Sequence, residues 1–190
     1  MKKTAVLLYD LFSNYELSVA LSVLYQGKKD FDVFCKNEYA ASEEGLKVKR
    51  GQSLSELVIS DYDSLLLTGC MGIDYVIEDE LVLDFIKYFN LNTHIVASIS
   101  SSPVLLLKAG IITGKQYLAG VKKEDLHNAG FTKEQLVSMR DITELQNEDG
   151  TKVSCLVDGN LITAVGHDFI NFGIKFGEML GLEFDPGWYK

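Results

Sequence analysis

The sequence predicts a single α/β domain with a mainly parallel sheet covered by helices on both faces. Segments with the apolar pattern of strands alternate with segments that have the pattern of helices, from the first residues onward. The strand segments are almost continuously apolar, which is typical of parallel strands buried on both sides. The chain has 190 residues and shows no linker, repeat or low-complexity stretch, which fits one domain over residues 1–190.

The first half carries most of the expected sheet. Ser53 and Glu56 have the spacing of a capping box, and Gly110 follows an apolar helix at the usual left-handed end position. Strands are predicted at residues 4–9, 31–35, 46–50, 64–68 and 94–98. Helices or helical turns are predicted at residues 14–24, 53–57, 80–89 and 103–109.

The second half is less regular, and turn residues mark its elements. Asp158-Gly159-Asn160 stands between two apolar runs, which is a strong hairpin pattern. Thr132 and Gln135 form a second capping-box pattern, and Gly130 and Gly181 follow the ends of two helices. Strands are predicted at residues 116–119, 153–157 and 161–164, and helices at 123–129 and 169–180.

Composition excludes several classes of function. The net charge of −9 argues against binding to nucleic acid or to an anionic membrane surface. No window approaches a membrane span, and the apolar residues 5–8 are too short for an export signal. The three cysteines, Cys35, Cys70 and Cys155, lack a disulfide-framework spacing, which fits a reducing cytoplasm. We therefore expect a cytoplasmic protein. We also expect no metal site or cofactor, because metal-ligand and phosphate-loop spacings are missing.

Residues 96–103 have the pattern of a tight corner between a strand and a helix. Ser102 stands at the cap position and Pro103 at the first helical position. Such a corner lifts one side chain out of the sheet and points free backbone N–H groups at the same spot. Ser100 is the residue at the corner. A serine-rich helix start also has a purely structural explanation, so Ser100 is either a site residue or part of the cap.

Three strand ends are expected to meet at one pocket. The carboxyl ends of parallel strands lie at the same edge of a sheet, where ligands bind in α/β folds. Glu16 follows the first strand, Gly69 and Cys70 follow the strand at 64–68, and Ser100 follows the strand at 94–98. If these strands are neighbours, the four residues converge.

Four segments together resemble the ThiJ/PfpI family, a branch of the class I glutamine amidotransferase-like superfamily. In this sequence the segments are 6–16, 63–69, 97–115 and 158–164. Their order and spacing extend from about residue 4 to residue 180. The resemblance implies a flavodoxin-like three-layer sandwich with a late β-hairpin. It also implies a homodimer, whose interface the aromatic tail (Phe184, Trp188, Tyr189) would help to cover.

The departures from that family affect the chemistry of the site. The resemblance implies an elbow cysteine, held as a thiolate by a protonated glutamate, and the matching positions are Ser100 and Glu16. Family proteases have a histidine directly after the nucleophile, where this chain has Ser101. Other members supply a histidine from the strand after the elbow helix, where residues 117–120 read Tyr-Leu-Ala-Gly. The second glycine of the family's double-glycine turn is Cys70.

These residues leave three site hypotheses open. Ser100 acts as a nucleophile with Glu16 as its base, and the N–H groups of Ser101 and Cys70, beside Gly69, form an oxyanion hole. Cys70 is a relocated reactive thiol with a lowered pKa, or a small buried apolar residue. His167 supplies the missing base, or is an ordinary loop histidine beside the last helix.

Three functions follow from these hypotheses. The first is binding of an unidentified small molecule, or a weak activity, at an altered elbow site. The second is an intracellular amidase, protease or aldehyde-modifying hydrolase that acts through Ser100 or Cys70. The third is an oxidative-stress sensor based on the Cys70 thiol.

Overall fold

The computed structural model describes residues 1–146, 150 and 152–189, and it has the predicted three-layer arrangement. A six-stranded sheet lies in the middle, in the order β2-β1-β5-β6-β10-β9. All neighbouring pairs are parallel except β10 and β9, which form an antiparallel hairpin. The expected mainly parallel sheet and late hairpin are therefore confirmed. The strands are β1 (Lys3–Leu7), β2 (Phe31–Phe34), β5 (Tyr62–Leu67), β6 (Ile95–Ile99), β9 (Cys155–Asp158) and β10 (Leu161–Ala164).

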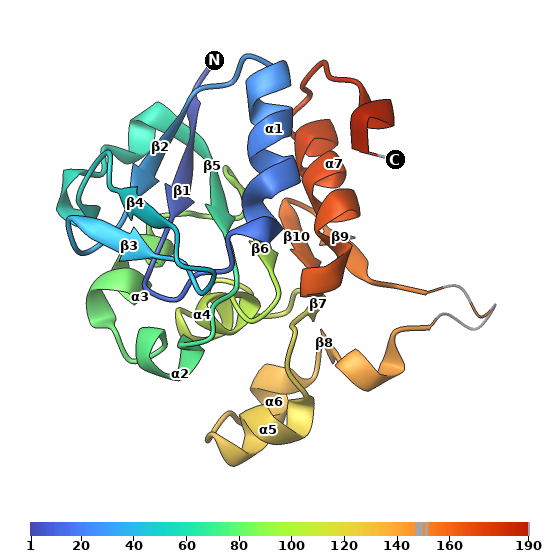
Figure 1. Ribbon diagram of the computed structural model, residues 1–190. Coiled ribbons are helices and arrows are strands. Elements are labelled where there is room, and N and C mark those ends of the chain that lie inside the picture. Colours follow the sequence, from blue (N-terminus) through green and yellow to red (C-terminus); the bar gives the residue numbers. More distant parts are fainter. Residues whose placement is uncertain (147–149, 151, 190) are drawn as a thin grey trace.

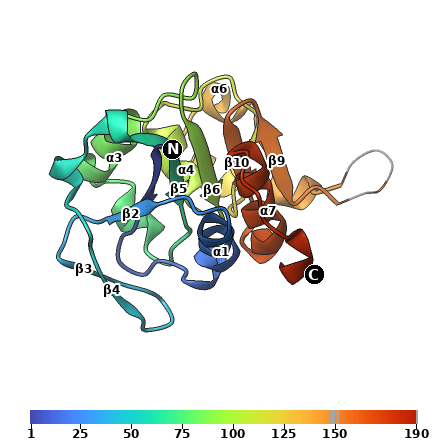
Figure 2. The same ribbon diagram turned by 90° about the horizontal axis from the view of Figure 1, so that it is seen from above.

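Helices cover both faces of this sheet. Figure 2, seen from above, shows α1 and α7 on one face and α3 with α4 on the other. The buried residues of α3, such as Phe85 and Ile86, lie on one side of the helix and join the core. The helices are α1 (Ser18–Gln26), α2 (Ile73–Val76), α3 (Glu80–Lys87), α4 (Pro103–Lys108), α5 (Lys123–Asn128), α6 (Lys133–Leu136) and α7 (Phe169–Met179). No helix in the described part of the chain is long and apolar enough to cross a membrane.

Two small strand pairs lie outside the main sheet. The strand expected at residues 46–50 is β4 (Lys47–Lys49), and it pairs with β3 (Tyr39–Ala41) in a hairpin of its own. The strand expected at 116–119 is β7 (Tyr117–Leu118), which pairs with β8 (Met139–Arg140). Figure 1 shows α5 and α6, next to β7 and β8, projecting away from the main sheet.

The helix starts agree with the sequence in two places and differ in one. Both expected capping boxes, Ser53 with Glu56 and Thr132 with Gln135, are present. Ser102 is at the N-cap of α4, but its side chain does not cap that helix. Its hydroxyl instead donates to the Ile99 carbonyl at 2.8 Å and contacts Ser98 Oγ at 2.7 Å, so it ties the corner to the preceding strand.

The pairing register of the three central strands brings their carboxyl ends together. Leu7 of β1 lies opposite Leu67 of β5, and Leu67 lies opposite Ser98 of β6. Residues that follow β1, β5 and β6 therefore emerge at one edge of the sheet. This edge holds the candidate site.

Candidate functional site

Ser100 lies at a strained corner between β6 and α4. Its φ of 62° places it in the left-handed region, which a residue with a side chain enters at a cost of about 1–2 kcal/mol. Its N–H donates to the Ala164 carbonyl of β10 at 2.8 Å, and its carbonyl accepts from the Gly120 N–H at 2.5 Å. Both backbone groups of Ser100 are therefore held by distant segments, which keeps the corner in this conformation.

Glu16 approaches Ser100 from the turn after β1. It lies in a short 3-10 helix, Tyr15–Leu17, and only 1% of its surface is exposed. Its Oε2 accepts from the Gly69 N–H at 2.7 Å and from the Thr68 hydroxyl at 3.0 Å. The Tyr15 hydroxyl donates to Oε1 at 3.4 Å. The carboxyl group is thus fixed by residues from two strand ends.

Burial raises the pKa of Glu16 above its ordinary value. Hydrogen bonds from the Gly69 N–H, Ser100, Thr68 and Tyr15 lower that pKa, and they offset the effect of burial only in part. Glu16 consequently keeps its proton to a higher pH than an exposed glutamate. A protonated carboxyl is a hydrogen-bond donor as well as an acceptor.

Two glycines form the close walls around these side chains. A Cβ on Gly69 would lie 2.6 Å from Ser100 Cβ and 2.9 Å from Glu16 Oε2. A Cβ on Gly166 would lie 2.5 Å from Glu16 Oε1 and 3.2 Å from Ser100 Oγ. Side chains at these two positions would occupy the space that Ser100 and Glu16 use. Glu16, Gly69 and Ser100 lie together in the structure, as expected.

Cys70 and Ser101 are joined by a reciprocal pair of contacts. The Cys70 N–H donates to Ser101 Oγ at 3.1 Å, and the Ser101 hydroxyl contacts the Cys70 carbonyl at 3.3 Å. The Cys70 N–H is therefore not available for the oxyanion hole expected from the sequence, and the Gly69 N–H is bonded to Glu16. The Cys70 part of the expectation was wrong because the Ser101 hydroxyl already accepts from that N–H, whereas the Ser101 N–H has no hydrogen bond to a described residue.

The Cys70 thiol lies in a different environment from the one the reactive-thiol hypothesis needs. Its residue is 8% exposed, and burial raises the pKa of the Cys70 thiol to about 12. Smaller contributions to this rise come from the nearby carboxylates of Glu43, Glu16 and Asp74. The lowered pKa expected for a relocated thiol is thus the opposite of what its surroundings produce. Cys35 is buried as expected, whereas Cys155 on the edge strand β9 is half-buried.

In the described part of the chain, none of the three histidines contacts the Ser100 hydroxyl. Gly166, not His167, is in contact with Glu16 and Ser100, and the His167 ring is exposed. Among the described residues the His167 ring has no hydrogen bond or ion pair. His127 Nδ1 contacts the Phe131 carbonyl at 3.1 Å, and His94 packs on Phe89. Within the described part of the chain, no group of three metal-ligating side chains comes together.

Four residues at the site were not found by sequence reasoning: Tyr15, Thr68, Gly120 and Gly166. Thr68 ends β5 and lies next to the predicted Gly69, and Tyr15 lies next to Glu16, so adjacency was a usable signal. Gly120 and Gly166 reach Ser100 from segments 20 and more residues away. Their approach depends on packing that the sequence pattern does not contain.

Comparison with known proteins decides the family. Residues 2–179 match the sequence profile of the DJ-1/PfpI family, which is nearly the whole chain. The chain belongs to the DJ-1/PfpI family. It is 30% identical over 135 residues to a protein of Bacillus subtilis named "Putative cysteine protease YraA". That match covers 68% of this chain and 78% of the relative.

Solved DJ-1/PfpI structures share the fold. The DJ-1 superfamily protein Atu0886 from Agrobacterium tumefaciens superimposes with a TM-score of 0.79 at 21% identity, over 98% of this chain and 93% of that one. A two-domain protein from Anabaena variabilis, with DJ-1/ThiJ/PfpI-like and ferritin-like domains, gives a TM-score of 0.76 at 22% identity. The match covers 98% of this chain and 51% of the Anabaena chain, so this chain spans about half of that protein's length.

Proposed function

We propose that this DJ-1/PfpI protein binds a small carbonyl- or carboxyl-bearing molecule at Ser100 without rapid turnover. One observation carries the proposal: Ser100 Oγ lies beside the buried Glu16, whose pKa is raised by burial, and no imidazole contacts either group among the described residues. A serine hydroxyl needs a base to become a nucleophile. A hydroxyl beside a carboxyl group that keeps its proton to a higher pH instead suits recognition of a polar oxygen.

The closed backbone around the corner supports binding over acyl transfer. A hydrolase stabilises the developing oxyanion with free N–H donors. Here the Gly69 and Cys70 N–H groups donate to Glu16 and Ser101, so in the described part of the chain the Ser101 N–H is left as a single donor of the expected pair. The loss of one such donor typically costs about 10²–10³ in turnover. The proposed chemistry is therefore reversible binding, with the Ser100 hydroxyl as the contact group.

A slow hydrolase is the second candidate function. The raised pKa of Glu16 brings this carboxyl closer to the range in which a general base works near neutral pH. The name of the Bacillus subtilis relative describes a cysteine protease, which belongs to the same broad reaction class. The sensor function expected from Cys70 has less support, because its thiol pKa is raised to about 12.

A ligand screen with two variants tests the proposal. Small amides, aldehydes and carboxylates are added at millimolar concentration, and the melting temperature is measured for wild type, Ser100→Ala and Ser60→Ala. Ser60 is an exposed serine distant in sequence from the site. We expect at least one compound to raise the melting temperature of wild type and Ser60→Ala and not of Ser100→Ala.

A fluorophosphonate distinguishes the two candidate functions. Selective labelling of Ser100 in the native protein, mapped by mass spectrometry, would overturn the binding proposal in favour of the hydrolase. Labelling no faster than at Ser60, together with a ligand in the screen, supports binding. A screen in which no compound depends on Ser100 contradicts the proposal.

A further inference from the structure

A cavity lies against the loops that follow β1 and β2. Its volume is about 300 Å³, at the lower end of the range of about 300–1,000 Å³ that is typical of small-molecule sites. Its walls are the segments after β1 and β2, part of β3, the end of α2 and the start of α3. Neither Ser100 nor Glu16 lines it. The cavity is therefore separate from the site of the proposed function.

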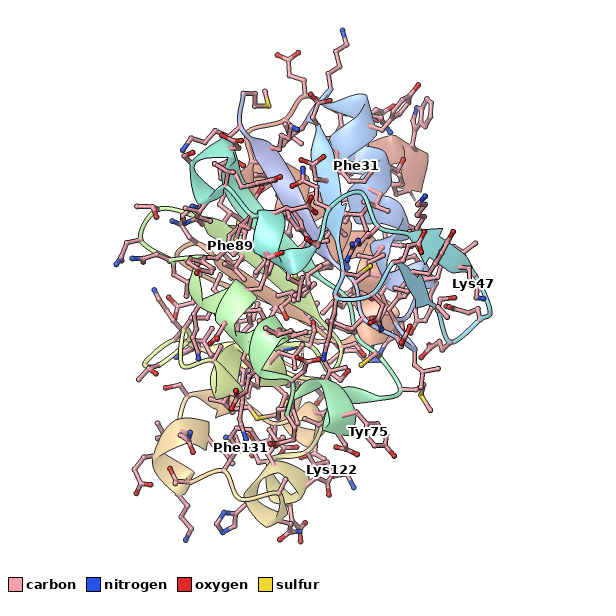
Figure 3. All side chains as sticks on the ribbon, turned by 90° about the vertical axis from the view of Figure 1, so that its left-hand side faces the viewer. Phe31, Lys47, Tyr75, Phe89, Lys122 and Phe131 are labelled. Carbon is pink, nitrogen blue, oxygen red and sulfur yellow. The ribbon has the colours of Figure 1, made fainter. Side chains whose placement is uncertain are left out.

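The floor of this cavity is apolar and two tyrosines stand at its mouth. Leu8, Val76 and Val82 are buried residues that line it. Tyr39 is 46% exposed and Tyr75 is 84% exposed, and neither hydroxyl has a hydrogen bond among the described residues. Figure 3 shows Tyr75 projecting from α2 on the same face as the hairpin that carries Lys47. Two exposed rings over an apolar floor favour a flat ring as the ligand.

The charges around the cavity balance. Lys36 and Asp79, which both line it, form an ion pair with 2.7 Å between Nζ and Oδ2. Asp10 also lines it, and the Arg50 guanidinium, which donates to the Lys36 carbonyl, lies close enough to act on the Cys35 thiol in the wall. A charged ligand would lose its hydration on entering the cavity and would find no excess of the opposite charge there. The cavity therefore suits a neutral molecule.

Asp10 provides the directional polar contact. Its Oδ1 accepts from the Ala41 N–H at 3.1 Å, while Oδ2 has no hydrogen bond to any described residue. A free carboxylate oxygen at the edge of an apolar cavity is a strong acceptor for a ring N–H. A neutral aromatic heterocycle with an N–H donor matches the apolar floor, the two tyrosine rings and the Asp10 acceptor together.

We propose that the cavity between the β1 and β2 loops and α2 binds a neutral, planar heteroaromatic molecule whose ring N–H donates to Asp10. The two tyrosine rings cover its faces, and the apolar floor excludes water from its carbon edge. The site is independent of Ser100. Tyr9, which lines it, also donates a hydrogen bond from its hydroxyl to the Thr68 carbonyl beside Glu16.

Indole and benzofuran provide the test, because they share a shape and differ in the N–H. Each is titrated into ¹⁵N-labelled protein, and the affinity and the shifted amides are recorded by NMR. We expect indole to shift amides at Asp10, Asn37 and Gly72 in a saturable way, and to bind at least fivefold more tightly than benzofuran. Tryptamine and indole-3-acetate, which add a positive and a negative charge, should both bind more weakly than indole.

Three variants complete the experiment. Tyr75→Ala should weaken indole binding by about tenfold, and Tyr25→Ala, at an 83% exposed tyrosine of α1, should leave it unchanged. Asp10→Asn keeps an oxygen for the Ala41 N–H and replaces the free acceptor by a donor, so the preference for indole over benzofuran should disappear. Circular dichroism and melting temperature verify that each variant folds. Unsaturable shifts, shifts confined to Gly166 and Ser101, or equal binding of indole and benzofuran to wild type would overturn the proposal.

Discussion

Gly69 lies against Ser100 with no room for a side chain between them. A Cβ at Gly69 would stand 2.6 Å from Ser100 Cβ and 2.7 Å from its Oγ. The Gly69 N–H also donates to Glu16, so the same residue sets the positions of both site side chains. Because the clash would involve the base of the Ser100 side chain, rotation of that side chain cannot relieve it.

We therefore expect Gly69→Ala to destabilise the protein by about 1–3 kcal/mol, the usual cost of overpacking a filled site. Gly51→Ala is the control, because a Cβ there would be 3.4 Å from its nearest neighbour, the Val33 carbonyl oxygen. Urea unfolding followed by circular dichroism measures both variants. Equal stabilities of Gly69→Ala and Gly51→Ala would contradict the close approach.

The strained corner predicts an order of stability for two substitutions of Ser100. Ser100→Ala and Ser100→Gly lose the same hydroxyl, but only glycine adopts a φ near 62° without steric cost. We expect Ser100→Gly to be about 1 kcal/mol more stable than Ser100→Ala in urea unfolding. At Ser60, which is not in the left-handed region, the order should reverse or vanish.

The raised pKa of Glu16 predicts a pH dependence of stability. The folded state binds the Glu16 proton more tightly than the unfolded state, so this stabilising contribution is fully present below the unfolded pKa, near 4.5. It is lost as pH rises through the folded pKa. Relative to Glu16→Gln, which carries no such proton, wild type should lose up to about 1.4 kcal/mol per pH unit in this window.

Urea unfolding of both proteins at several pH values above 4 measures that difference. Glu16→Gln keeps an amide oxygen for the Gly69 N–H, so its fold should persist. A stability difference that is constant with pH, or that moves in wild type's favour as pH rises, would show that the Glu16 pKa is not raised.

The buried Cys70 thiol predicts slow alkylation with an unusual pH profile. A thiol pKa of about 12 instead of 9 means about a thousandfold less thiolate near neutral pH. The iodoacetamide rate at Cys70 in native protein should keep rising tenfold per pH unit past pH 9, as far as the protein stays folded. In urea the rate should level off near pH 9. Peptide mapping separates Cys70 from Cys35 and Cys155, and a native plateau at or below pH 9 would restore the reactive-thiol hypothesis.

Local patterns in the sequence were sufficient to predict the central part of the fold. The buried strands, the late hairpin around Gly159 and both capping boxes depend on neighbouring residues, and each is present in the structure. The hairpin of β3 with β4 was only half predicted. Tyr39–Ala41 is too short for an alternating pattern, and its pairing depends on contacts outside the main sheet.

The only site residues that could be predicted are those that follow a strand end in the sequence. Glu16, Gly69 and Ser100 follow strand ends, so the topology alone brings them to one edge. The use of the Cys70 N–H by Ser101 Oγ was not predictable, because it depends on the rotamer of one hydroxyl. The raised pKa values of Glu16 and Cys70 likewise arise from burial, which the sequence does not quantify.

The reciprocal contacts between Cys70 and Ser101 affect how fast the backbone around the site opens. Although these residues lie in loops, the amides of Gly69, Cys70, Ser100 and Gly120 are all hydrogen-bonded. Such amides exchange with solvent slowly, like those of core strands, since exchange needs an opening of the structure. Such walls would preorganise the binding site proposed at Ser100, which would select ligands by shape on encounter and gain little from closing around them.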